Sequence, residues 1–84
     1  RWILCVNLWP ETITLALSGL VGPVYDLEEN AHRLTPCLDD DLARAKALAQ
    51  AYLARRGLSL EGLYGVALTV PGTVDYVAQG GRAD

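Results

Sequence analysis

The 84-residue chain has few basic residues, no long apolar run and no recognisable export signal. Its seven lysines and arginines are scattered among ten acidic residues, and the resulting formal charge of −3 argues against nucleic-acid binding. No apolar stretch reaches the roughly 18 residues that a membrane span requires. No basic segment followed by an apolar one marks a signal peptide. We therefore expect a cytoplasmic protein that contacts neither membrane nor nucleic acid through this segment.

Cysteine and histidine are scarce, which limits the chemistry available. The two cysteines, Cys5 and Cys37, lack the spacing of a metal site. Cys5 lies in an apolar segment, where a thiol behaves as a small hydrophobic group, so we expect no disulfide and a reducing compartment. The single histidine, His32, stands beside Arg33, and a surface role is favoured over catalysis. We predict no catalytic residue, no metal site and no cofactor.

The length of the chain allows one small domain and excludes a two-lobed enzyme. A chain of 84 residues buries only about 60–65% of its extended surface, which gives a thin core. We expect residues 1–78 to form this domain. Residues 79–84 lack an apolar anchor and are expected to form a flexible tail. Because the chain begins at Arg1 rather than at methionine, we expect an excised or processed segment.

Three strands are predicted in the first part of the chain. Residues 2–8 form a nearly continuous apolar run, which predicts a strand covered on both faces. Residues 12–17 alternate polar with apolar side chains, which predicts a strand buried on one face. A weaker third strand is expected over residues 24–33. Three acidic side chains there would protect a sheet edge: Asp26, Glu28 and Glu29.

The segment from Asp39 to Gly57 gives the clearest helical pattern. The aspartates at 39–41 are expected to supply the N-cap, Arg55 and Arg56 to neutralise the last carbonyls, and Gly57 to end the helix. One face is apolar: Leu42, Ala45, Leu48, Ala49, Tyr52 and Leu53. The opposite side carries good helix formers, for which we favour solvent exposure over a second packing surface: Ala43, Ala47, Ala51 and Ala54.

A fourth, buried strand is predicted from Leu63 to Val70, after the helix. The order is then β-β-β-α-β, which indicates an α/β domain with one mixed sheet and a helix on one face. Two loops follow strands, at residues 7–12 and residues 71–75. Ligands gather outside the carboxyl ends of strands in open sheets, so both loops are candidate sites. A simple turn is the alternative interpretation for each.

The phrase Gly65-Val66-Ala67-Leu68-Thr69-Val70-Pro71-Gly72-Thr73-Val74-Asp75, together with this order of elements, resembles the amino-terminal lobe of the ROK family. That family comprises sugar kinases and sugar-responsive transcriptional repressors with a two-lobed, ribonuclease-H-like (actin-like ATPase) fold. The resemblance extends from Ile3 to about Asp75. It implies that the backbone around Gly72 and Thr73 borders a sugar pocket. The family's remaining pocket motifs, its catalytic aspartate and the repressors' helix-turn-helix have no counterpart in these residues.

The loop that approaches ATP in the family's kinases, Asp-x-Gly-Gly-Thr, matches a stretch of very different chemistry here. Asn7 replaces the aspartate, Trp9 and Pro10 replace the glycines, and Glu11 replaces the threonine. Proline removes a donor, the indole blocks close approach, and a carboxylate repels phosphate. We therefore expect a degenerate phosphate loop that does not bind ATP. Its positions are Asn7, Leu8, Trp9, Pro10, Glu11 and Thr12.

The resemblance leads to three hypotheses. The first is a fragment of the effector-binding domain of a sugar-responsive transcriptional regulator. The second is the amino-terminal lobe of a sugar kinase that, at full length, phosphorylates a hexose with ATP. The third is a structural or interaction domain that keeps the fold without a ligand. A lone lobe leaves surfaces uncovered, so we also expect self-association through an apolar face, with the alanine side of the helix as one candidate.

Overall fold

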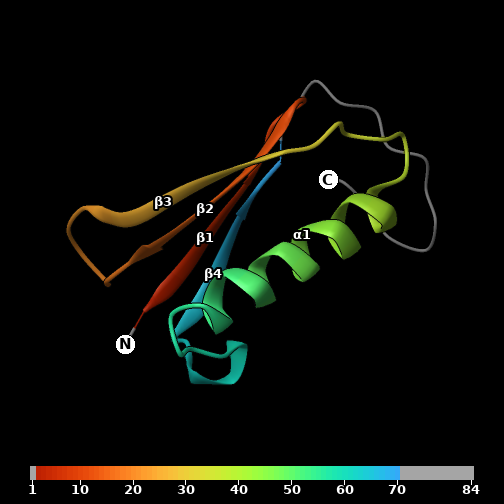
Figure 1. Cartoon of the computed structure of the whole chain (residues 1–84). Helices are drawn as coiled ribbons and strands as arrows, with labels where there is room; N and C mark the ends of the chain where they lie inside the picture. Colours follow the sequence, from red (N-terminus) through yellow and green to blue (C-terminus); the bar gives the residue numbers. More distant parts are fainter. Residues whose placement is uncertain (1, 71–84) are drawn as a thin grey trace.

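The computed structural model describes residues 2–70 (Figure 1). Within this part of the chain, strands and a long helix follow one another in the predicted β-β-β-α-β order. A single 3₁₀ turn at Leu60–Gly62 precedes the last strand. The elements are β1 (Ile3–Leu8), β2 (Thr12–Ser18), β3 (Val24–Ala31), α1 (Leu38–Ala54) and β4 (Gly65–Thr69).

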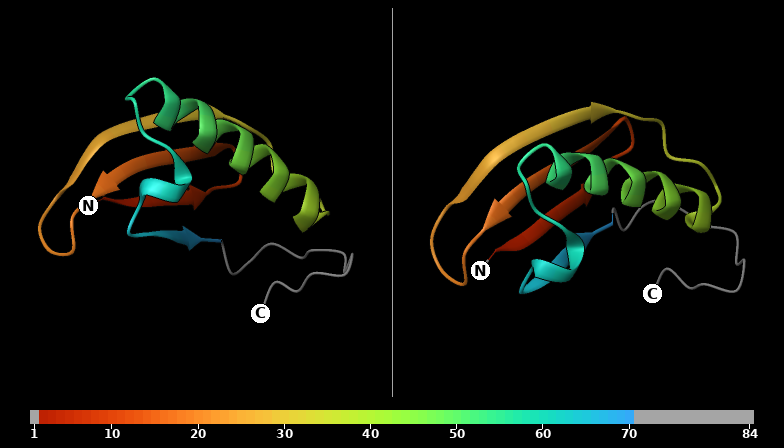
Figure 2. Two further views of the ribbon diagram at one scale, coloured as in Figure 1. Left: turned by 90° about the horizontal axis from the view of Figure 1, so that it is seen from below. Right: turned by 60° about the horizontal axis from the view of Figure 1, so that its bottom comes forward.

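The strands form one mixed sheet in the order β3-β2-β1-β4. Short turns connect β1, β2 and β3, which are antiparallel, whereas β4 runs parallel to β1. Parallel neighbours need a long crossover, and α1 supplies it. Figure 2 shows α1 lying across one face of the sheet. The predicted α/β class, element order and mixed sheet with a helix on one face are therefore confirmed.

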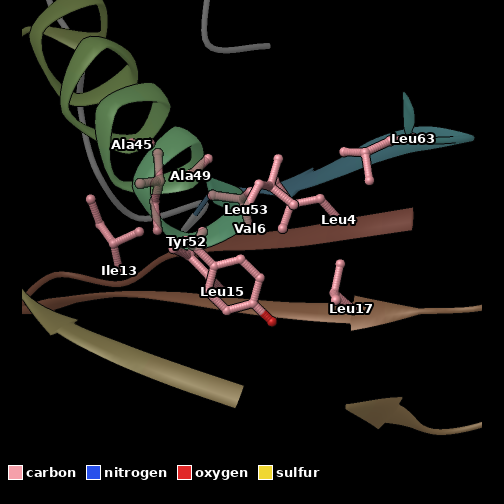
Figure 3. Packing of buried hydrophobic residues seen from close by; sticks show 11 residues of the cluster. Leu4, Val6, Ile13, Leu15, Leu17, Ala45, Ala49, Tyr52, Leu53 and Leu63 are labelled. Carbon is pink, nitrogen blue, oxygen red and sulfur yellow. The ribbon is translucent and has the colours of Figure 1, made fainter. Parts of the chain in front are cut away.

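The hydrophobic core lies between α1 and the two middle strands (Figure 3). Leu4 of β1 pairs in register with Leu17 of β2, and Val6 pairs with Leu15. These pairs place large aliphatic side chains on the sheet face that α1 covers. The helix contributes side chains from successive turns: Ala45, Ala49, Tyr52 and Leu53. Burial of these apolar groups holds the helix on the sheet, at about 25 cal/mol for each Å² removed from water.

The burial of β1 and β2 is the reverse of what the sequence predicts. β1 alternates between buried and half-buried residues, while β2 is buried on both faces. On the face away from α1, the residues of β4 that lie beside β1 are small and therefore cover it only in part: Gly65, Ala67 and Thr69. β2 lies between β1 and β3, whose side chains are longer at this position: Thr14 of β2 faces Asn7 on one side and Glu29 on the other. The small side chains of β2 are therefore covered by their flanking strands.

The prediction of a buried fourth strand is also wrong. β4 begins at Gly65 rather than Leu63, and it lies at an edge of the described sheet. Val66 and Leu68 remain 54% and 47% exposed. Although this segment is apolar, the rest of residues 2–70 leaves most of its residues exposed. The other edge strand is β3. The sequence predicts an edge position for it from its acidic residues, and that position is confirmed.

The ends of α1 agree with the sequence at one end and differ at the other. Cys37, rather than an aspartate, occupies the N-cap position. At the C-terminal end, Gly57 adopts the left-handed conformation (φ 70°) that was predicted for it. The Leu58 N–H donates to the Leu53 carbonyl oxygen at 2.9 Å, which closes the helix. The predicted solvent exposure of the alanine side is confirmed for Ala43, Ala47, Ala51 and Ala54.

Candidate functional site

At one end of the molecule, the candidate loop lies beside the carboxyl ends of β1, β3 and β4 and near the beginning of α1 (Figure 1). Asn7, near the end of β1, pairs in register with Thr14 of β2 and with Thr69 of β4. This places three polar side chains side by side on the sheet face away from α1. The other predicted site residues, Gly72 and Thr73, lie outside the described residues.

The six positions that the sequence predicts to form a degenerate phosphate loop are divided between strands and a tight turn. Asn7 and Leu8 belong to β1, and Thr12 is the first residue of β2. Leu8 is buried in the core. The Asn7 side-chain amide donates to the Thr14 hydroxyl at 3.1 Å. The turn itself therefore consists of the three residues between the strands, and the Asn7 side-chain amide is engaged within the sheet.

The backbone of this turn is bonded inward. The Trp9 N–H donates to the Thr12 carbonyl at 2.8 Å, and Pro10 has no N–H to offer. The carbonyl oxygens of Pro10 and Glu11 accept from the N–H groups of Leu34 and His32, at 3.1 and 3.0 Å. The turn presents three exposed residues to solvent: Trp9, which is 48% exposed, Pro10 and Glu11.

A buried carboxylate holds the segment that supports the turn. Asp41 is fully buried, and its oxygens accept from the Thr35 N–H at 3.1 and 3.2 Å. The Thr35 hydroxyl and the His32 Nε2 each lie 3.2 Å from Asp41 Oδ1. Asp41 thus fixes the connection between β3 and α1, the same connection that bonds to the turn through His32 and Leu34. The cluster therefore positions the turn through the backbone bonds of His32 and Leu34.

Two sequence predictions are corrected by this cluster. His32 is not a surface residue, since its side chain is only 11% exposed and faces Asp41. Asp41 does not cap the helix, because its carboxylate bonds to the preceding loop rather than to first-turn N–H groups. From the apolar face of the helix alone, Asp41 is expected to face solvent, as Asp39 and Asp40 do. The one available signal was its position in the helical repeat, four residues before the buried Ala45.

A second set of polar contacts ties the other end of α1 to β3. Arg55 contacts Glu28 at 2.6 Å, and Arg56 contacts Asp26 at 3.3 Å. The Arg55 guanidinium lowers the pKa of Glu28 below 4.5. Burial raises the pKa of Tyr52, whose hydroxyl donates to the Asp26 carbonyl at 2.8 Å. Of the two arginines predicted to face the last carbonyls, Arg56 does so, donating to the Tyr52 carbonyl at 2.9 Å.

Residues 2–70 contain no cluster of histidine, cysteine, aspartate and glutamate placed to hold a metal ion. Cys5 and Cys37 are free thiols. Among the helices of this same region, none is long and apolar enough to cross a membrane. No family model, curated protein or solved structure matches this chain. The functional assignment therefore depends on the geometry of the turn and on the resemblance noted in the sequence.

Proposed function

We propose that this chain is part of the effector-binding domain of a sugar-responsive transcriptional regulator of the ROK type. In this proposal the chain is a ribonuclease-H-like lobe of a cytoplasmic protein, and it has lost the ability to bind ATP. The sugar pocket would be bordered by Gly72 and Thr73 and completed by other parts of the parent protein. No catalytic role and no cofactor are assigned to the chain.

The observation that carries the proposal is the inward bonding of the β1–β2 turn. A phosphate-binding loop presents several backbone N–H groups to its ligand and lets the ligand come close to the backbone. Here the Trp9 N–H is used by Thr12, Pro10 has none, and Trp9 adds a large, 48% exposed residue to the turn. The carboxylate of Glu11 adds repulsion toward an anion. Sugar sensing needs none of these phosphate contacts, whereas a kinase does.

The arrangement of strands and helix supports the same assignment. The β-β-β-α-β order is the one on which the resemblance to this lobe rests. The turn also lies at the carboxyl end of β1, where open α/β sheets bind their ligands. A domain that keeps this scaffold while its turn opposes phosphate fits a regulator better than a kinase.

The test uses the full-length parent protein and its promoter DNA. A panel of hexoses, pentoses and amino sugars is added to the protein–DNA complex, and DNA binding is followed by fluorescence anisotropy. We expect one sugar to change DNA affinity at least about tenfold, a coupling of about 1.4 kcal/mol. Sugar phosphorylation with ATP would identify a kinase instead. If the protein neither binds DNA nor responds to any sugar, it is a structural domain and the proposal is wrong.

A further inference from the structure

β3 carries one extra residue opposite the middle of β2. Leu15 of β2 pairs with Glu28, whereas Leu17, two residues further along, pairs with Tyr25, which is three residues from Glu28. The extra residue forms a bulge, and Asp26 within it has a positive φ of 56°. Among residues 2–70 it is the only residue other than glycine with a positive φ. This conformation is strained for residues with a side chain, although aspartate tolerates it better than most.

The side-chain pattern of β3 favours a regular strand over this bulge. Tyr25 and Leu27 alternate with acidic residues, as in a strand with one apolar face. The bulge interrupts the alternation, because it places Glu28 opposite Leu15 and leaves Leu27 64% exposed. If β3 continued from Tyr25 without a bulge, Leu27 would lie opposite Leu15 on the face that α1 covers. The bulged register therefore needs contacts that offset this loss.

The C-terminal end of α1 supplies those contacts. The buried Tyr52 hydroxyl donates to the Asp26 carbonyl oxygen at 2.8 Å. Arg56 lies 3.7 Å from the centre of the Tyr52 ring and contacts the Asp26 carboxylate at 3.3 Å. Arg55 contacts Glu28 at 2.6 Å. The bulge makes these contacts possible, since Asp26 has no partner on β2 and Glu28 is turned toward the face of α1.

Beyond the bulge, β3 runs along the sheet toward the β1–β2 turn (Figure 1). His32 and Leu34 donate their N–H groups to carbonyl oxygens of that turn, and the His32 ring contacts Asp41. Loss of the bulge would move this part of the chain by one position, so that His32 would leave both its partners. The extra residue would pass into the connection between β3 and α1.

We propose that β3 is a register switch that couples the C-terminal end of α1 to the β1–β2 turn. In the described register the bulge is present and the turn is bonded to His32 and Leu34. In a second, less populated register the bulge is absent, Leu27 packs between β2 and α1, and the turn exchanges its partners by one residue. The coupling is a property of the scaffold and does not depend on what the turn binds.

Relaxation dispersion and saturation-transfer measurements on the ¹⁵N-labelled 84-residue chain test the switch, because register shifts occur in microseconds to milliseconds. We expect one exchange process with a single rate at the amides of Leu27, Glu28 and His32 and at Glu11 of the turn. The second register should hold between about 0.1% and 10% of the molecules. Absence of exchange at these amides, or exchange in β3 that does not reach Glu11, would overturn the proposal.

Three substitutions at Asp26 separate the switch from a general loss of stability. Asp26→Gly suits a positive φ and should lower the population of the second register at least about threefold. Asp26→Val, with a β-branched side chain, should raise this population at least about tenfold. Asp26→Asn is the matched control, because it removes the contact with Arg56 as the others do but tolerates a positive φ. It should leave the population unchanged within about twofold. Equal populations in the glycine and valine variants would contradict the switch.

Cross-strand nuclear Overhauser contacts identify the second register itself. Thr14 pairs with Glu29 in the bulged register and would pair with Glu28 in the regular one. We expect the contact with Glu28 to appear in Asp26→Val, and Tyr52→Phe, which removes the hydroxyl from the bulge, to raise the same population. A folded Asp26→Val chain that keeps Thr14 opposite Glu29 throughout would show that β3 has only one register. If this variant does not fold, unchanged exchange in both Tyr52→Phe and Asp26→Gly would overturn the proposal.

Discussion

Asp41 shows how a single side chain can position a loop that it does not belong to. At the beginning of α1, its carboxylate accepts hydrogen bonds from the Thr35 N–H and the Thr35 hydroxyl, and it contacts His32. A fully buried carboxylate is tolerated only when such partners replace the water that it loses. Because His32 and Leu34 also bond to the β1–β2 turn through their backbone, Asp41 connects the helix to the candidate site.

Replacing Asp41 should therefore cost much more stability than replacing a neighbouring aspartate. Asp41→Ala leaves buried donors without a partner, and we expect the free energy of unfolding to fall by about 2–3 kcal/mol. Asp40→Ala, at an exposed position in the same helical turn, should cost about 0.5 kcal/mol. Urea denaturation followed by circular dichroism measures both. Equal losses for the two variants would contradict the role assigned to the Asp41 carboxylate.

At the scale of elements, the ion pair between Arg55 and Glu28 connects the end of α1 to β3. The guanidinium lowers the pKa of Glu28 in the folded chain below the 4.5 of an unperturbed glutamate. The stability that the pair contributes is thus fully present above about pH 4.5 and is lost as the pH falls through the lowered pKa. The contribution is small, since the Arg55 side chain is 55% exposed.

The pH dependence of unfolding checks this contact. Arg55→Gln should lower stability at neutral pH by less than about 1 kcal/mol. It should also reduce the loss of stability on acidification below pH 4.5, because Glu28 then titrates closer to its ordinary pKa. Arg44→Gln, an exposed change elsewhere on α1, serves as the control. A pH profile identical to that of the unaltered chain would show that the Arg55–Glu28 contact does not contribute.

Local patterns predicted the elements better than they predicted burial. The helix, its end at Gly57 and the edge position of β3 follow from periodicity, from glycine's tolerance of positive φ and from clustered acidic residues. The burial of β1, β2 and β4 depends on which strands lie beside each one, and a linear pattern does not contain that information. The Asp41 cluster was missed for the same reason, because its partners come from a loop whose path the sequence does not reveal.

At the scale of the whole molecule, the described residues form a sheet that is covered by a helix on one face and has one protected edge. The candidate site lies at one end of this scaffold, where the β1–β2 turn follows the carboxyl end of β1.

The central claim is that the β1–β2 turn does not receive a nucleotide phosphate. The most direct measurement is a titration of the ¹⁵N-labelled chain with Mg-ATP up to millimolar concentration, followed by the backbone amide signals of Trp9, Glu11 and Thr12. The inward bonding of the Trp9 N–H and the exposed Glu11 carboxylate predict no saturable shift at these amides. Saturable shifts confined to the turn would contradict the account and would identify it as a working phosphate loop.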